Sequence, residues 1–171
     1  MRKYLLIILI PAIIIAAAVS SCGGTSGGSG QAVLSPEPDE IRAFSLDEND
    51  MSGYKKVFGH ASVPGGAGGQ TCSETWRNKD GEKIEIRYQV CHSPENADTI
   101  LAYYRDDISK GGRSPEDLEP PIGDRSWKAA GDRHELAFRK GSVIIRVTGK
   151  DDSTCRSISE SVLSRLEKAG Y

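Results

Sequence analysis

The chain lacks the cysteine spacings that are typical of a zinc site. None of its four cysteines belongs to a Cys-x-x-Cys or Cys-x-x-Cys-His motif, and zinc sites are commonly built from such pairs. The chain also has no excess of basic residues, because 22 lysines and arginines are balanced by 24 aspartates and glutamates. A nucleic-acid-binding protein needs a basic surface, so the overall charge argues against that class.

Catalytic and ligand-binding motifs are absent as well. Residues 64–69 form a glycine-rich loop, but no lysine follows it and the next segment is predicted to be a strand, whereas a phosphate loop leads into a helix. Four acidic residues crowd a later loop without the order of an EF-hand, so we expect a solvated loop and not a calcium site. These residues are Glu116, Asp117, Glu119 and Asp124. The sequence therefore predicts a protein without catalytic residues, metal or cofactor.

The longest apolar run is too short to cross a membrane comfortably. Residues 5–19 are apolar apart from Pro11, a run of 15, and a helix needs about 20 residues to span the hydrocarbon core. Arg2 and Lys3 precede the run, and two serines separate it from Cys22. A basic start, a short apolar core and small residues at its end are typical of a secretory signal peptide.

The stretch Val19-Ser20-Ser21-Cys22 resembles the lipobox of bacterial lipoproteins, although Val19 stands where leucine is more usual. The resemblance implies that residues 1–21 are a signal peptide and that Cys22 becomes a lipidated N-terminus. Two or more acyl chains hold a protein stably on a membrane, here a cell membrane or an outer membrane, with the domain outside the cytoplasm. Gly23 follows in place of aspartate, so nothing favours retention at an inner membrane. The alternative is an uncleaved signal anchor in which Cys22 has no role.

Residues 22–43 are expected to form a tether, and residues 44–171 a single globular domain. Glycine and serine dominate the first part of the tether, and Pro36 and Pro38 follow, which predicts a flexible and then an extended chain. The remaining 128 residues match a common size for one domain. Without residues 1–21 the chain keeps 20 basic residues against 24 acidic ones, which argues against electrostatic adhesion to anionic lipid.

The clearest hairpin is predicted between residues 72–77 and 82–90. Asn78-Lys79-Asp80-Gly81 is typical of a type I turn with glycine in the left-handed bulge position. That turn would pair Trp76 with Ile84 and Cys72 with Tyr88.

A second hairpin is predicted between residues 134–139 and 142–148. Lys140-Gly141 is expected to be its two-residue turn. This turn would pair Phe138 with Val143 and Glu135 with Arg146.

Each hairpin is followed by a predicted helix. Ser93 caps the first, with Pro94 at its first position and Gly111 at its end. Asp152 or Ser153 is expected to cap the second. Their apolar stripes are Ala97, Ile100, Leu101, Tyr104 and Ile108 in the first helix and Cys155, Ile158, Val162, Leu166 and Ala169 in the second.

This twice-used strand-strand-helix unit predicts an α+β fold, in which two helices pack on one antiparallel sheet. The arrangement, with Ile122-Gly123-Asp124-Arg125-Ser126-Trp127 leading into residues 136–141, resembles the PsbP/Mog1-type α/β sandwich of many bacterial surface lipoproteins. The resemblance implies a domain without shared catalytic residues, in a family whose members mostly bind other molecules or assist assembly.

Three cysteines remain once Cys22 carries lipid. Any two of Cys72, Cys91 and Cys155 are able to pair in an exported chain, and the sequence does not select the pair. A thiol-dependent redox or hydrolytic enzyme is one alternative function, because His92 follows Cys91 and Cys155 lies near a helix N-terminus. Neighbours on a strand point to opposite faces and Cys155 lies on an apolar stripe, so we expect structural cysteines.

The function expected from these observations is a non-catalytic module that binds a small molecule or a protein. An envelope assembly factor is a further alternative. Where such a domain has a cleft, we expect Trp127 to form its rim together with Asp124 and Glu119 of the acidic loop.

Overall fold

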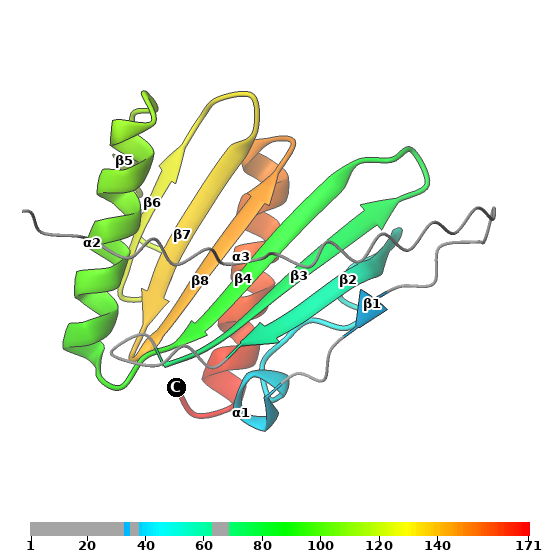
Figure 1. The fold of residues 1–171 in the computed structure, drawn as a ribbon, viewed down its shortest axis with the longest axis horizontal. Coiled ribbons are helices and arrows are strands. Elements are labelled where there is room, and N and C mark those ends of the chain that lie inside the picture. The colour runs from blue at the N-terminus through cyan, green and yellow to red at the C-terminus, as the bar shows by residue number, and fades with distance from the viewer. Residues whose placement is uncertain (1–32, 35–37, 63–68) are drawn as a thin grey trace, which may run out of the picture.

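The computed structural model describes residues 33–34, 38–62 and 69–171. The predicted signal peptide, Cys22, most of the predicted tether and all but one residue of the glycine-rich loop lie outside these ranges. The described residues form one sheet with three helices (Figure 1).

The sheet has eight strands in the order β1-β2-β3-β4-β8-β7-β6-β5. All neighbouring strands are antiparallel except β1 and β2, which are parallel. The strands are β1 (Val33–Leu34), β2 (Tyr54–Ser62), β3 (Gln70–Asn78), β4 (Lys83–Val90), β5 (Glu116–Asp117), β6 (Arg125–Ala129), β7 (His134–Lys140) and β8 (Val143–Gly149). The two-residue strand β5 lies in the segment that was expected to be loop.

The three helices are α1 (Asp39–Arg42), α2 (Pro94–Lys110) and α3 (Asp152–Lys168). The α+β fold with two helices on an antiparallel sheet is confirmed, and so is the repeated order β3-β4-α2 and β7-β8-α3. The two long helices lie on opposite faces of the sheet (Figure 1). We call the face that carries α2 the front face and the face that carries α3 the back face. Within the described ranges, no helix combines the length and apolar character that crossing a membrane requires.

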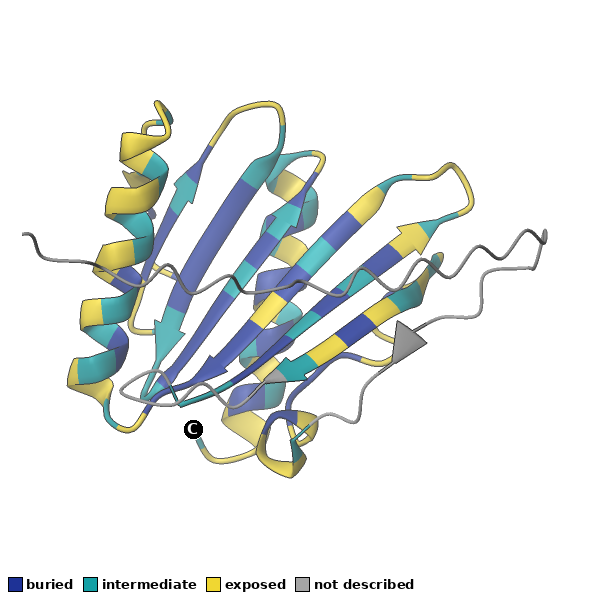
Figure 2. Ribbon diagram, in the orientation of Figure 1, coloured by how far each residue is buried: buried dark blue, intermediate teal, exposed yellow. Residues whose placement is uncertain are grey.

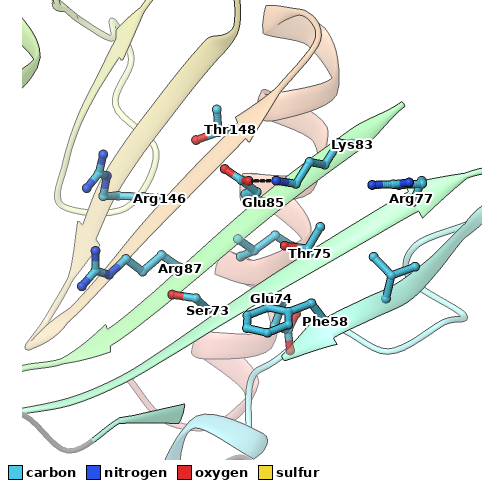
Figure 3. Close-up of a pocket in the computed structure, with 12 residues that line it drawn as sticks. Phe58, Ser73, Glu74, Thr75, Arg77, Lys83, Glu85, Arg87, Arg146 and Thr148 are labelled. Atoms are coloured by element: carbon cyan, nitrogen blue, oxygen red, sulfur yellow. Dashed lines mark ion pairs between the residues drawn. The ribbon is translucent and has the colours of Figure 1, made fainter. Parts of the chain in front are cut away.

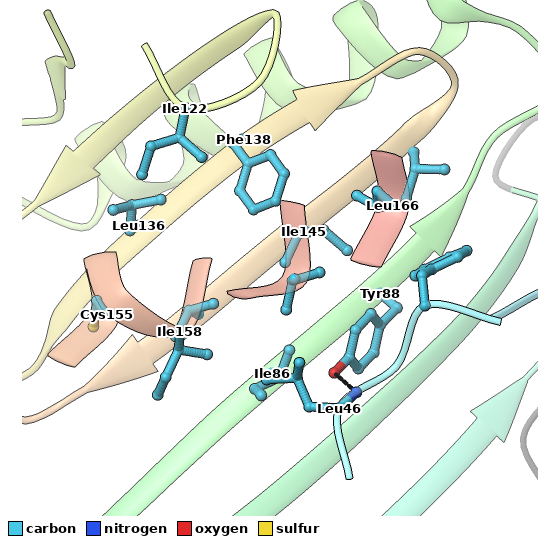
Figure 4. Close-up of a cluster of buried hydrophobic side chains, with 14 of the residues drawn as sticks. Leu46, Ile86, Tyr88, Ile122, Leu136, Phe138, Ile145, Cys155, Ile158 and Leu166 are labelled. Atoms are coloured by element: carbon cyan, nitrogen blue, oxygen red, sulfur yellow. Dashed lines mark hydrogen bonds between the residues drawn. The ribbon is translucent and has the colours of Figure 1, made fainter. Parts of the chain in front are cut away.

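Side-chain alternation along the strands explains how both faces are covered. Leu136 and Phe138 of β7 belong to the back-face core with α3, whereas Ala137 between them packs in the front-face cluster with Ala97 and Leu101 of α2. Because successive residues point to opposite faces, one strand supplies both cores. The larger core is on the back face (Figure 4).

The N-terminal segment completes the back-face core. Ile41 of α1 is fully buried, and the backbone amide of Leu46 donates to the Tyr88 hydroxyl at 3.3 Å (Figure 4). The Phe44 ring packs edge-on against Tyr171, with centroids 5.3 Å apart. The folded region therefore begins before residue 44, because an isoleucine buried in the core lies within the segment that was expected to be tether.

The first hairpin has the predicted register, with Trp76 opposite Ile84 and Cys72 opposite Tyr88. Gly81 has φ +82°, as the bulge position of this turn requires.

The predicted register of the second hairpin is wrong. Phe138 lies opposite Ile145 and Ala137 opposite Arg146, so the two turn residues are Gly141 and Ser142. A type II′ turn needs positive φ at its first central position, where glycine is favoured. Gly141 occupies that position with φ +55°, and Lys140 remains in the strand.

The helix caps follow the predicted chemistry with one correction. Ser93 Oγ accepts from the Asn96 amide at 3.2 Å and caps α2 as predicted. The cap of α3 is Asp151, which accepts from the Thr154 amide at 2.8 Å. Asp152 and Ser153 instead lie inside the first turn, because Asp151 is the residue with extended backbone before the helix.

Candidate functional site

Helix α2 covers only part of the front face. It packs mainly against β7 and β8, and its cluster includes Trp127 and Ala129 of β6. It reaches β4 through Tyr104, whose hydroxyl donates to Gln89 Oε1 at 2.6 Å. Buried and more exposed residues alternate along most of β3 and the first five residues of β4, whereas β7 is buried at four consecutive positions (Figure 2). A groove of about 620 Å³ lies over the uncovered strands. We call this part of the front face, formed by β2, β3, β4 and the adjacent side of β8, the open half.

Basic side chains line both ends of the groove. Lys55, Arg77 and Lys83 lie directly opposite one another on β2, β3 and β4; these three residues are the first basic row. Arg87 of β4 lies directly opposite Arg146 of β8; this pair is the second basic row. Four residues separate the rows along β4, which corresponds to about 13 Å. Figure 3 shows the two arginines of the second row side by side and Arg77 at the other end.

A middle row lies between the two basic rows. Phe58, Thr75, Glu85 and Thr148 occupy successive strands in register. The Phe58 side chain is 41% exposed, and its ring stacks on His60 with centroids 6.4 Å apart. The middle row therefore offers an aromatic surface and hydroxyl groups between two sets of cations.

Buried contacts fix the position of Arg146. Its Nε and Nη2 atoms donate to Glu135 Oε1 at 2.8 and 2.5 Å. Glu135 is 4% exposed, and its Oε2 atom also accepts a hydrogen bond from Arg113 Nη1 at 3.0 Å. The Arg146 guanidinium lies 4.3 Å from the centroid of the Tyr104 ring. Arg146 therefore has a defined orientation before any ligand arrives.

Glu85 is the carboxylate at the centre of the groove, and it is already paired. It forms an ion pair with Lys83 (Figure 3), and it accepts a hydrogen bond from Arg133 Nη1 at 3.1 Å. Burial alone would raise the pKa of Glu85, but the hydrogen bond from Lys83 and the charge of Arg133 outweigh it and hold the pKa below its usual value. Glu85 therefore stays ionised at neutral pH and neutralises the charge beside it.

Arg77 and Arg87 have no carboxylate partner within the part of the chain that the structure describes. The guanidinium carbon of Arg87 lies 5.8 Å from the centroid of the Tyr104 ring. Both side chains are exposed. The groove can therefore form new ion pairs with an anionic ligand at both of its ends.

The predicted rim residues do not present one surface. Trp127 is 2% exposed and packs beneath α2. Asp124 accepts from the Gly141 amide at 2.8 Å and from Arg139 at 3.1 Å, so it holds the β7–β8 turn. Glu119 is exposed. A ligand-binding role for these three residues stays a prediction, and their positions do not favour it.

The cysteines have the surroundings of structural residues. Cys72, Cys91 and Cys155 are buried, and no two of them are joined by a disulfide. Burial raises the pKa of Cys91 and raises that of Cys155 to about 11. The Cys155 thiol donates to the carbonyl of His134 at 3.5 Å. A thiolate nucleophile needs a lowered pKa, so these environments give the thiol-enzyme alternative no support.

Two of the histidines, His60 and His134, lie on strands that are not neighbours in the sheet. His60 is exposed and lies on the front face, whereas His134 is half-buried at the start of β7. Across residues 33–34, 38–62 and 69–171, no three histidine, cysteine or acidic side chains converge as metal ligands would.

Sequence reasoning missed both basic rows. The register predicted for the first hairpin already places Arg77 opposite Lys83, and alternation along the next strand gives Lys83, Glu85 and Arg87 one face. The pairing of Arg87 with Arg146 had no local signal, because β4 and β8 belong to different units and lie far apart in the sequence.

Comparisons of the chain with models of protein families, with curated proteins and with solved structures found no match.

Proposed function

We propose that this protein is a membrane-anchored lipoprotein, held outside the cytoplasm by a lipidated Cys22. The lipobox resemblance at residues 19–22 and the glycine- and serine-rich segment after it support this anchor. The domain acts as a non-catalytic binding module, and the open half of its front face is the binding surface.

The observation that supports this function best is that the helices of the described residues leave most of the front face of β2, β3 and β4 uncovered. A polar sheet face is commonly solvated, so exposure alone does not indicate a binding surface. The open half also holds a groove, in which an exposed phenylalanine lies between two rows of cations. Arginine and aromatic side chains are enriched where proteins bind partners.

The binding surface is tested by photo-crosslinking in the envelope of the source cell. A photoreactive residue replaces Thr75 in the groove or, as the matched control, the exposed Ser164 on α3 at the back face. We expect a discrete adduct from position 75 alone, which mass spectrometry identifies and purified components reproduce. Equal adducts from both positions would contradict the proposal, as would enzymatic turnover that one side-chain change abolishes.

The anchor is tested by the intact mass of the protein extracted from membranes. We expect a chain that begins at Cys22 and carries the added mass of acyl chains. A chain that retains residues 1–21 without added mass would show that an uncleaved signal anchor holds the protein.

A further inference from the structure

We infer that the groove binds an extended acidic segment of a partner protein, with one carboxylate at each basic row and an apolar side chain on Phe58. This inference rests on the proposed function and names the chemistry of the partner. The charges, the spacing and the rigidity of the groove support it.

The positive charge of the open half is only partly neutralised by the nearby carboxylates of Glu85 and Glu135. Like charges directly opposite each other on neighbouring strands destabilise a sheet, yet Arg87 faces Arg146, and Arg77 faces both Lys55 and Lys83. The chain as a whole is slightly acidic, with a formal net charge of −2. Cations are therefore concentrated on this surface against the overall composition, as electrostatic complementarity to an anionic partner requires.

The spacing of the two rows selects an extended ligand. Arg77 lies opposite Lys83, and Lys83 precedes Arg87 by four residues on the same strand, so the unpaired guanidinium groups are anchored about 13 Å apart along the strand. One small anion does not reach both. An extended polypeptide presents side chains i and i+4 on the same side at about the same 13 Å. Side chain i+2 then lies over the middle row, where Phe58 is exposed.

The second basic row is organised for a carboxylate. Glu135 and the Tyr104 ring hold the Arg146 guanidinium, while the exposed Arg87 lies beside it. Planar guanidinium groups bind carboxylates through paired hydrogen bonds. Because Arg146 is already held in place, little side-chain freedom is lost when it binds.

The probe is a fluorescein-labelled peptide of nine residues with aspartate at its third and seventh positions and phenylalanine at its fifth. Binding to the full protein in a nonionic detergent is followed by fluorescence anisotropy. We expect Arg77→Gln and Arg87→Gln each to weaken binding about tenfold, and Phe58→Ser to weaken it several-fold. Arg156→Gln is the matched control, since Arg156 lies on α3 away from the groove, and it leaves the affinity unchanged.

Three outcomes would overturn the inference. The first is unchanged affinity in both groove variants while circular dichroism shows that they are folded. The second is equal binding of a peptide whose aspartates stand at the third and sixth positions, because those side chains do not share one side of an extended chain. The third is tighter, groove-dependent binding of an anionic polysaccharide or of inorganic polyphosphate, which would assign the cations to another class of polymer.

The test also separates this inference from the function on which it rests. If the photo-crosslink from position 75 forms equally in Arg77→Gln and Arg87→Gln, and the acidic peptide does not bind, the open half is a binding surface for a partner without paired carboxylates. If position 75 and position 164 crosslink equally, the proposed function itself fails.

Discussion

The front face of the sheet has two halves built from equivalent hairpins. On β7 and β8, Ala137 and Ile144 are buried under Ala97 and Leu101 of α2. On β3 and β4, the residues that point to the same face are Ser73, Thr75 and Arg77, followed by Lys83, Glu85 and Arg87. The back face of both halves is buried and mostly apolar, with Glu74 as a buried carboxylate on β3. The two hairpins therefore differ in one respect, which is whether a second layer covers their front.

This difference comes from the path of the helices. Each hairpin is followed by its own helix, but α2 leaves its hairpin and crosses to the front of β7 and β8, while α3 packs on the back of the same two strands. The second hairpin is thus enclosed between two helices. The first hairpin is covered on its back by α3 and the segment around Ile41, Phe44 and Leu46, and α2 leaves most of its front uncovered.

The largest effect is expected from a carboxylate on the back of the open half. Glu74 is 1% exposed, and it accepts from Lys56 Nζ at 2.6 Å and from Trp76 Nε1 at 2.9 Å. Glu74→Gln leaves the largely buried ammonium without its carboxylate, so we expect the free energy of unfolding in urea to fall by about 3 kcal/mol. Glu85→Gln on the front of the neighbouring strand is the matched variant, and we expect it to cost less than about 1 kcal/mol. Equal losses in the free energy of unfolding would show that the carboxylates of the back and front faces contribute equally to stability.

The covered and open parts of the front face are compared directly by truncating one apolar side chain in each. Leu101→Ala opens a cavity between α2 and the sheet, where Leu101 is buried, and we expect a loss of about 2–3 kcal/mol in the free energy of unfolding. Phe58→Ala removes an exposed ring and is expected to cost less than about 1 kcal/mol. Chemical denaturation measures both. A loss at Phe58 as large as that at Leu101 would mean that the open half is stabilising core and not a binding surface.

The sequence predicted the local parts of this arrangement. The turn at residues 78–81 determines which residues of β3 and β4 face each other, and Ser93 with Pro94 begins α2; these signals act within a few residues. The second register was wrong because glycine in a two-residue turn fits either central position, depending on the turn type. The structure places Gly141 first.

The candidate site depended on non-local information. Trp127 was expected at a binding rim, but its burial is decided by α2, whose path over β6 has no signature in the residues near Trp127. The second basic row forms only because β4 pairs with β8. Alternating polarity on β4 against continuous burial on β7 is the signal that distinguishes a strand covered on one face from a strand covered on both.

The caps of the two long helices offer a smaller contrast that depends on pH. Hydrogen bonds from the Ser153 hydroxyl and the Thr154 amide lower the pKa of Asp151 to about 2. We expect Asp151→Ala to cost about 1 kcal/mol at neutral pH. Because the folded pKa lies below the unfolded value, this difference is fully present above about pH 4 and shrinks as the pH falls toward 2.

Urea unfolding across a series of pH values measures that contrast. Ser93→Ala in α2 is the comparison variant, since a hydroxyl cap does not itself titrate and its removal costs about 1 kcal/mol. The Ser93 hydrogen bond lowers the pKa of Glu95, so we expect a cost that changes with pH only through Glu95, and by less than that of Asp151→Ala. Asp151→Asn keeps a capping oxygen and should recover most of the stability lost in Asp151→Ala. A difference in the free energy of unfolding between wild type and Asp151→Ala that does not change with pH would refute the role of the ionised cap.

The smallest expected effect has the opposite sign. Arg87 lies directly opposite Arg146 and has no carboxylate partner within the described residues, so Arg87→Gln removes a repulsion. We expect the free energy of unfolding to rise by up to about 0.5 kcal/mol at low ionic strength, and the gain to disappear in about 1 M salt, where exposed charges are screened. Arg105→Gln near the covered half removes an ion pair with Asp117 and should give no gain. If Arg87→Gln stabilises the fold and weakens binding of the acidic peptide, Arg87 serves the partner and not the sheet. A loss of stability in Arg87→Gln would instead assign Arg87 a structural role in the open half.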